Sequence, residues 1–178
     1  MVRTYRDLVR EIAYDNYGYV TTTGAVEAGV PAVELPKLAA RGGLDHVGYG
    51  LYRVTDIPPT DNDQFAEATL RAGEGAHLRG ESVLALLGVA DVNPRKITVG
   101  TVRRVRRSMP SYMKVTQVPA GTKVTRYRGI RAQQLSDALL ECQGRVPNAR
   151  LRDAAVKGRA AGLLTTAEWN RVRKELAE

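Results

Sequence analysis

Arginine residues are concentrated in the middle of the chain. The run VRRVRRSMPSYMK contains four arginines within five positions, and residues 95–131 contain eleven basic and no acidic residues. A guanidinium group is planar and can donate two parallel hydrogen bonds to a phosphate or a carboxylate. The pattern therefore predicts binding of a polyanion, either the phosphates of DNA or an acidic protein surface. The members of this predicted basic patch are Arg95, Lys96, Arg103, Arg104, Arg106, Arg107, Lys114, Lys123, Arg126, Arg128 and Arg131.

The charge of the whole chain makes this segment stand out. The net charge is +8, yet residues 1–57 hold six basic against seven acidic residues, and residues 58–94 hold two against six. We expect the basic segment to be extended, so that strand pairing collects several of its cations on one sheet face. A solvated surface without a partner is the alternative interpretation, since most charge runs have that role.

A second set of polar residues lies in the first third of the chain. In a helix beginning near Glu34 and ending at Gly42, Lys37 and Arg41 are the only cations on the face opposite the apolar residues. A following hairpin would present Tyr49 and Arg53 to the DNA backbone. The predicted DNA-contacting residues are Thr22, Thr23, Glu34, Lys37, Arg41, Tyr49 and Arg53.

The residues that usually perform catalysis or bind metals are scarce. One cysteine, Cys142, and two histidines, His46 and His77, cannot supply a zinc site of three or four nitrogen or sulfur ligands. The chain contains no Walker A pattern, no GxGxxG and no Glu-x-Lys pair of the kind found in metal nucleases. His77, Cys142 and Asp137 are interpreted as structural residues. We therefore predict a protein that is not an enzyme, without catalytic residues, a metal or a cofactor.

The elements that would position these residues begin with three helices. Apolar residues recur at helical spacing from Tyr5 to Ala13, and a short second helix is expected before Gly29. The third helix begins near Glu34, because Pro36 is tolerated only in a first turn. The segment LDHVGYGLYRV then alternates as a two-stranded hairpin does. Three helices followed by a hairpin predict a winged helix-turn-helix over residues 1–57.

The remaining chain predicts a linker and a second domain. Residues 58–64 are rich in proline and acidic residues and lack apolar periodicity, so they are the predicted linker. The pattern of residues 65–178 predicts a C-terminal domain of mixed helices and strands with a small, mostly antiparallel sheet. The predicted fold class of the chain is α+β. Strands are expected in KITVGTV, YMKVTQV and KVTRYRGI, and helices over 65–72, 82–87, 132–142, 148–161 and 166–178.

Several short motifs follow one another along nearly the whole chain in the order of a known family. They are Gly29-Val30 with Leu35, Leu38, Gly42, Leu44 and Val47; Gly50-Leu51-Tyr52; Ala76-His77-Leu78 with Gly80; Ser82-Val83-Leu84; Leu87-Gly88-Val89; Tyr127-x-Gly129-Ile130; and Leu135-Ser136-Asp137-Ala138-Leu139. In this order they resemble the AbiEi-type antitoxins of bacterial toxin–antitoxin operons. Each motif alone has low specificity, and the resemblance depends on the order in which the motifs occur along the chain.

The resemblance implies an antitoxin that represses transcription from its own promoter through an N-terminal winged helix. It also implies that the C-terminal domain counteracts a nucleotidyltransferase-like toxin, with or without direct contact. The expected partners are promoter DNA and that toxin, without a membrane, and the expected location is the cytoplasm. The alternative is a protein-binding adaptor that does not bind DNA and whose basic sheet holds an acidic partner.

Overall fold

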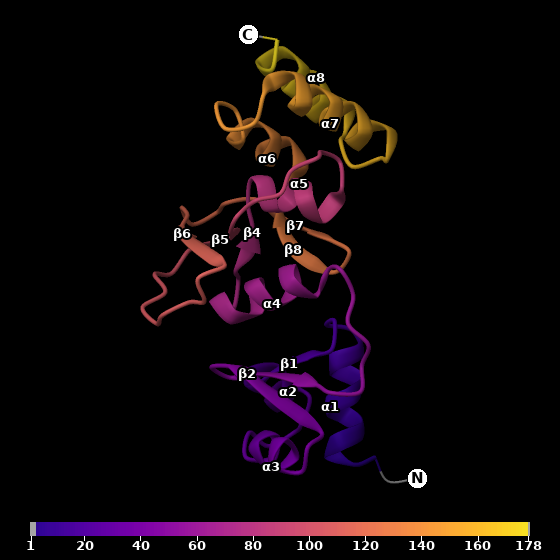
Figure 1. Ribbon diagram of the computed structural model, residues 1–178, viewed down its shortest axis with the longest axis vertical. Coiled ribbons are helices and arrows are strands. Elements are labelled where there is room, and N and C mark those ends of the chain that lie inside the picture. Colours follow the sequence, from indigo (N-terminus) through magenta and orange to yellow (C-terminus); the bar gives the residue numbers. More distant parts are fainter. Residues whose placement is uncertain (1–2, 178) are drawn as a thin grey trace. The chain divides into compact units, whose positions relative to one another are not determined.

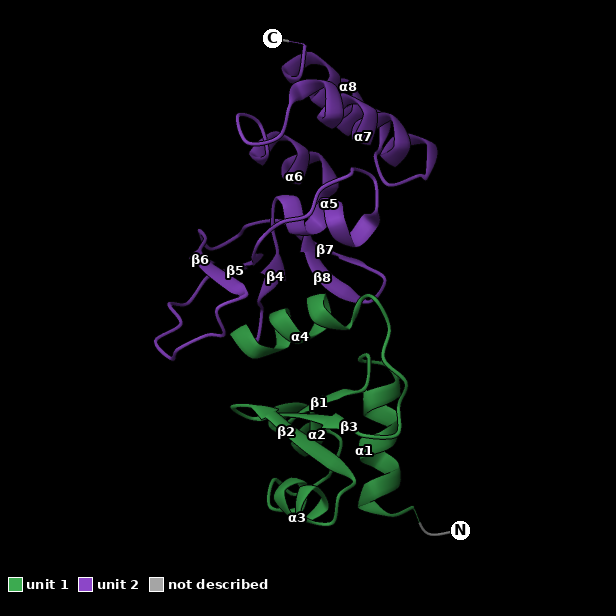
Figure 2. Ribbon diagram, viewed as in Figure 1, with its two compact units in different colours: residues 1–73 green, residues 74–178 purple. Residues whose placement is uncertain are grey.

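The computed structural model describes residues 3–177 and has a mixed α+β architecture (Figure 1). The chain forms two compact units, residues 1–73 and residues 74–178 (Figure 2). These are called the N-terminal unit and the C-terminal unit below. None of the helices formed by residues 3–177 has the length and apolar character needed to cross a lipid bilayer.

The N-terminal unit begins with helices that are defined by their caps. In α1, Thr4 and Asp7 form a capping box, in which each side chain bonds to the backbone N–H of the other residue. Thr21 caps α2 by accepting a hydrogen bond from the Gly24 N–H. The elements are α1 (Tyr5–Tyr14), β1 (Tyr19–Thr21), α2 (Thr22–Glu27), α3 (Glu34–Ala40), β2 (Leu44–Gly48), β3 (Leu51–Val54) and α4 (Asp63–Ala72).

A three-stranded antiparallel sheet and the first three helices share one apolar core. The strand order is β1-β3-β2, so the short strand β1 pairs with β3 on the side away from β2. Val9 and Ala13 of α1, Ala25 of α2 and Leu35 of α3 are all buried in this core. The predicted helices and hairpin are confirmed, whereas β1 was not predicted because three residues are too few to show an alternating pattern.

The end of the N-terminal unit lies beyond the predicted linker. The division falls after Gly73, and the segment 58–64 leads directly into α4 of the same unit. Asp63 is buried, accepts hydrogen bonds from Thr60, and forms an ion pair with Arg53 of β3 at 3.2 Å. In α4, Glu67 accepts a 2.6 Å hydrogen bond from the Tyr19 hydroxyl. These polar contacts between distant positions of the chain attach α4 to the first unit, and sequence periodicity does not reveal them.

The C-terminal unit contains a five-stranded sheet of mixed direction. The order is β6-β5-β4-β8-β7, in which β5–β6 and β4–β8 are parallel while β4–β5 and β7–β8 are antiparallel. The prediction of a mostly antiparallel sheet is therefore wrong. The elements are β4 (His77–Leu78), α5 (Glu81–Leu87), β5 (Ile97–Thr101), β6 (Met113–Gln117), β7 (Val124–Tyr127), β8 (Ile130–Gln133), α6 (Leu135–Glu141), α7 (Asn148–Ala160) and α8 (Thr166–Glu175).

Two boundaries in this unit differ from the sequence prediction. The run 123–130 is a hairpin instead of one strand, because Arg128 and Gly129 both adopt positive φ and reverse the chain between β7 and β8. Helix α6 begins at Leu135, since Ala132 pairs with Leu78 as part of β8. Helices α5 to α8 pack around a core that includes Leu84, Leu139 and Leu151. A capping box of Thr165 and Glu168 starts α8 at Thr166, the residue at which this helix was expected to begin.

Candidate nucleic-acid interface

Helix α3 carries the first predicted group of DNA-contacting residues. Leu35 faces the core, which leaves Lys37 and Arg41 exposed, with the Lys37 side chain 55% accessible. Lys37 forms an ion pair at 2.8 Å with Glu34, one turn earlier in the helix. An exposed pair of this kind stabilises a helix by only a few tenths of a kcal/mol, so a stronger anion can displace the carboxylate. Arg41 forms the C-cap of α3 through its backbone.

The hairpin of β2 and β3 carries the second group. Tyr49 lies at its turn between two glycines and is 82% exposed. Gly50, with φ +59°, accepts a 2.9 Å hydrogen bond from the Thr22 N–H at the start of α2. Thr23 is exposed in the same first turn. The structure thus brings the start of α2 close to the hairpin turn, as a shared surface requires.

Arg53 occupies a different position from the one predicted. Its guanidinium donates to the carbonyl oxygens of Val54 and Ile57 and to the Asp63 carboxylate, and it lies 5.8 Å from the centre of the Tyr19 ring. The side chain is only 17% exposed. Because these partners already bind the guanidinium, the structure gives Arg53 a role inside the unit, and not at a phosphate.

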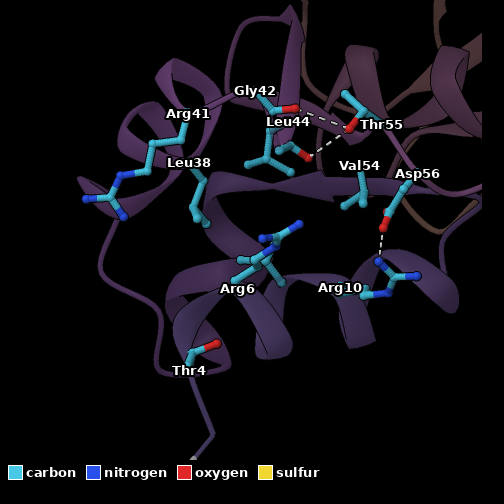
Figure 3. Close-up of a pocket in the computed structure, with 12 residues that line it drawn as sticks. Thr4, Arg6, Arg10, Leu38, Arg41, Gly42, Leu44, Val54, Thr55 and Asp56 are labelled. Carbon is cyan, nitrogen blue, oxygen red and sulfur yellow. Dashed lines mark hydrogen bonds and ion pairs between the residues drawn. The ribbon is translucent and has the colours of Figure 1, made fainter.

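Two further arginines of the N-terminal unit were absent from the sequence prediction. Arg6 and Arg10 stand one turn apart on α1 and line a pocket of about 360 Å³ together with Arg41 (Figure 3). Arg10 forms an ion pair with Asp56, beyond the end of β3. The sequence pattern that could have revealed them is the i, i+4 spacing of two arginines on a predicted helix, which places both on one helix face.

The four clustered arginines lie in a loop. Residues 102–112, which we call the arginine loop, connect the parallel strands β5 and β6 without forming a helix or strand. Arg103, Arg104, Arg106 and Arg107 are all exposed in it. The expectation of an extended strand is wrong here, because β5 ends at Thr101 and a parallel neighbour can be reached only through a crossover connection.

The remaining cations of the basic patch are distributed over the strands and turns around the arginine loop. Lys114 pairs with Thr98, and Arg126 pairs with Arg131, so strand registers place these three cations on one face of the sheet. Lys114 lies on the edge strand β6 and Arg126 on the opposite edge β7. The sheet thus collects several cations on one face, as predicted, but spreads them across its width. Arg95, Lys96, Lys123 and Arg128 are exposed and lie outside the strands.

Two titratable residues of the C-terminal unit, His77 and Cys142, are buried. His77 is 1% exposed, and neither imidazole nitrogen has a hydrogen-bond partner among residues 3–177. Burial lowers the pKa of His77, so its ring is neutral at pH 7. Burial raises the pKa of the Cys142 thiol to about 12, which suppresses the reactive thiolate. In the described part of the chain, His, Cys, Asp and Glu side chains form no group of three that could hold a metal ion.

Comparisons with known proteins give little further information. No family model matches the chain, and no curated protein matches it. Among solved structures, the RV2827C protein from Mycobacterium tuberculosis is similar at a TM-score of 0.47 and 21% sequence identity, over 99% of this chain and 78% of that chain.

Proposed function

We propose that residues 1–57 form a winged helix-turn-helix that binds DNA, with α3 as the recognition helix and the β2–β3 hairpin as the wing. The observation that carries this proposal is the element order α1-β1-α2-α3-β2-β3 with the antiparallel sheet β1-β3-β2. In winged helix-turn-helix proteins the recognition helix enters the major groove and the wing contacts the flanking backbone.

The exposed groups on α3 and the wing support this proposal. Val33, at the start of α3, is 63% exposed and can contact a thymine methyl group, while Lys37 and Arg41 can donate to base edges or phosphates. Tyr49 at the wing turn has a hydroxyl suited to a phosphate oxygen. Arg53 is excluded from this set because Asp63 and two carbonyl oxygens hold its guanidinium.

We further propose that the chain is an antitoxin of an AbiE-like operon, which represses its own promoter and counteracts a nucleotidyltransferase-like toxin. The support is the ordered series of motifs that resembles AbiEi-type antitoxins, together with a DNA-binding candidate at one end and an arginine-rich C-terminal unit. The arginine loop is the candidate surface for the second partner, either promoter phosphates or an acidic toxin surface. In this proposal the C-terminal unit acts without catalysis or a cofactor.

Substitution of the recognition helix tests the DNA-binding proposal. The variant Lys37→Ala with Arg41→Ala is compared with Lys157→Ala with Lys174→Ala, which removes the same charge from exposed positions of α7 and α8. Binding to a DNA fragment from upstream of the protein's own gene is measured by fluorescence anisotropy. We expect the α3 variant to bind at least tenfold more weakly, because a base or phosphate contact is worth about 1–3 kcal/mol. Equal affinities of the two variants would exclude α3 as the DNA-reading element.

A protein-binding adaptor is the second candidate function. It is favoured by one observation, the nearly balanced charge of residues 1–57, which supplies little electrostatic attraction to DNA. In that case the chain binds an acidic protein through the arginine loop, and wild-type protein shows no salt-dependent DNA binding. Co-purification with the product of the adjacent gene, combined with absent DNA binding, identifies this function.

A further inference from the structure

The pocket of Figure 3 lies wholly within the N-terminal unit. It is formed by the first half of α1, the end of α3 with the glycine turn after it, and the start of β2 with the end of β3. Its volume of about 360 Å³ falls within the range of small-molecule sites, roughly 300–1,000 Å³.

The walls of the pocket combine an apolar surface with cations. Val9, Leu44 and Val54 are buried side chains that line it, and Leu38 is half-buried beside them. In Figure 3 the Arg6 side chain lies among Leu38, Leu44 and Val54, whereas the Arg41 guanidinium points away from these apolar residues. A ligand with an apolar body would therefore remove apolar surface from water while its charged end meets a guanidinium.

Most polar groups around the pocket already have partners. Arg10 binds Asp56 and the Tyr14 hydroxyl, Thr4 is engaged with Asp7, and the Thr55 hydroxyl donates to the carbonyl oxygens of the glycine turn. The side chains of Arg6 and Arg41, in contrast, form no hydrogen bond or ion pair with any residue from 3 to 177. The lining thus carries three arginines against one aspartate, and its two available donors are both cationic.

The position of Arg6 violates a local rule of helix stability. It stands in the first turn of α1, where the helix dipole favours acidic residues and disfavours cations. Asp7 lies beside it, but Thr4 holds that carboxylate through its N–H and its hydroxyl. Thr4 and, to a smaller extent, the charge of Arg6 lower the pKa of Asp7, so this carboxylate offsets only part of the cost of a cation at the start of α1.

We propose that this pocket binds a small organic anion, a carboxylate attached to an apolar body, with Arg6 as the group that binds the carboxylate. Leu38, Leu44 and Val54 contact the apolar body. This site is separate from the proposed reading face of α3 except for Arg41, and it does not depend on DNA binding.

The test uses the full chain and three probes that separate charge from apolarity. These are 1-naphthoate, its uncharged counterpart 1-naphthamide, and acetate, which has the charge without the apolar body. We expect saturable binding of 1-naphthoate to one site by calorimetry, with 1-naphthamide and acetate at least fivefold weaker. Amide chemical shifts of the unsubstituted protein should change at residues 4–10, 38–44 and 54–56. Shifts confined to other segments, or equal binding of 1-naphthamide, would overturn the proposal.

Substitutions then identify the cations. Arg6→Gln should weaken 1-naphthoate binding about threefold to tenfold, the range for charge-assisted contacts at a partly solvated site. Arg41→Gln, made separately, should have a smaller effect, because the Arg41 guanidinium points away from the apolar residues of the pocket. The control is Arg3→Gln, because Arg3 precedes the same helix, pairs with Glu11 and does not line the pocket. Arg6→Gln should leave the melting temperature unchanged or raise it, since it removes a cation from a helix N-terminus. Equal affinities of all three variants would exclude these arginines from the site.

Discussion

The N-terminal unit and the arginine loop of the C-terminal unit place arginine in contrasting surroundings, although Arg79 and Arg171 elsewhere in the C-terminal unit are also paired with carboxylates. In the N-terminal unit Arg53, Arg10 and Arg71 are held by Asp63, Asp56 and Glu67, so these side chains act as connections within the fold. In the C-terminal unit the arginine loop contains no acidic residue and exposes all four of its arginines. The number of cations in a segment therefore says less about binding than the presence of a carboxylate that folding brings close to each of them.

The largest expected effect is on the boundary of the N-terminal unit. A fragment of residues 1–73 should be more stable than one of residues 1–57 by about 3 kcal/mol, because the shorter fragment leaves the half-buried guanidinium of Arg53 without Asp63. It also removes Glu67, the acceptor of the Tyr19 hydroxyl. Urea denaturation followed by circular dichroism measures both fragments. Equal stabilities of the two fragments would place the domain boundary in segment 58–64. They would also weaken the contrast between the paired arginines of the N-terminal unit and those of the arginine loop.

A smaller effect is expected when the Arg53 connection alone is broken. Arg53→Gln should lower the free energy of unfolding by about 2 kcal/mol, since it leaves a buried carboxylate at Asp63 with fewer donors. The matched control is Arg10→Gln, because the ion pair of Arg10 is exposed on both sides and should contribute less to stability than the Arg53 pair. If both substitutions have the same effect, burial does not distinguish the two arginines.

We expect His77 of the C-terminal unit to make the stability of the protein depend on pH near and below pH 6.5. Its pKa is lowered by burial, so the unfolded state binds a proton at a higher pH than the folded state does. Stability from this residue is therefore complete above pH 6.5 and is lost as the pH falls below it, by at most about 1.4 kcal/mol per pH unit. His77→Leu should reduce this loss between about pH 7.5 and 5.5 in urea titrations. An unaltered slope in His77→Leu would assign the dependence to carboxylates.

The smallest effect on stability is expected in the arginine loop. Arg103→Gln with Arg104→Gln should change the free energy of unfolding by less than about 0.5 kcal/mol, because both side chains are exposed. If the loop binds promoter phosphates, the slope of log affinity against log salt should fall by about 0.9 for each phosphate that the variant no longer neutralises. Lys157→Gln with Lys174→Gln controls for net charge. Unchanged DNA binding and unchanged toxin neutralisation would show that the loop is only a solvated surface.

The elements predicted from sequence are those with strong local patterns. The helices of residues 5–14 and 166–175 were predictable because a polar cap precedes an amphipathic repeat, with Thr165 and Glu168 forming the clearest cap. Strands β1 and β4, of three and two residues, are too short to show a period, and they form because longer strands pair with them. Their positions depend on tertiary contacts, and local sequence does not encode those contacts directly.

In the candidate site, too, some features follow from local sequence patterns and others depend on tertiary contacts. Exposure of Lys37, Arg41 and Tyr49 follows from helical and hairpin spacing, and the structure agrees with it. The burial of Arg53 depends on Asp63, which is ten residues away and lies after two prolines that suggested a linker. The pocket of Arg6 and Arg41 joins residues from α1 and the end of α3, so only the folded chain brings them together.

The parallel pairing of β4 with β8 has a consequence for the order in which the chain folds during synthesis. Leu78 pairs with Ala132, so the middle of the second sheet stays incomplete until the hairpin of β7 and β8 has left the ribosome. The first unit needs nothing beyond Gly73 and can fold while the rest is being translated. When only residues 1–120 have emerged, the nascent chain therefore carries a finished N-terminal unit and strands β4, β5 and β6, with the edge of β4 that later pairs with β8 still unpaired. Such an intermediate is the most aggregation-prone species on the pathway, because its unpaired strand edges wait for a partner that does not yet exist.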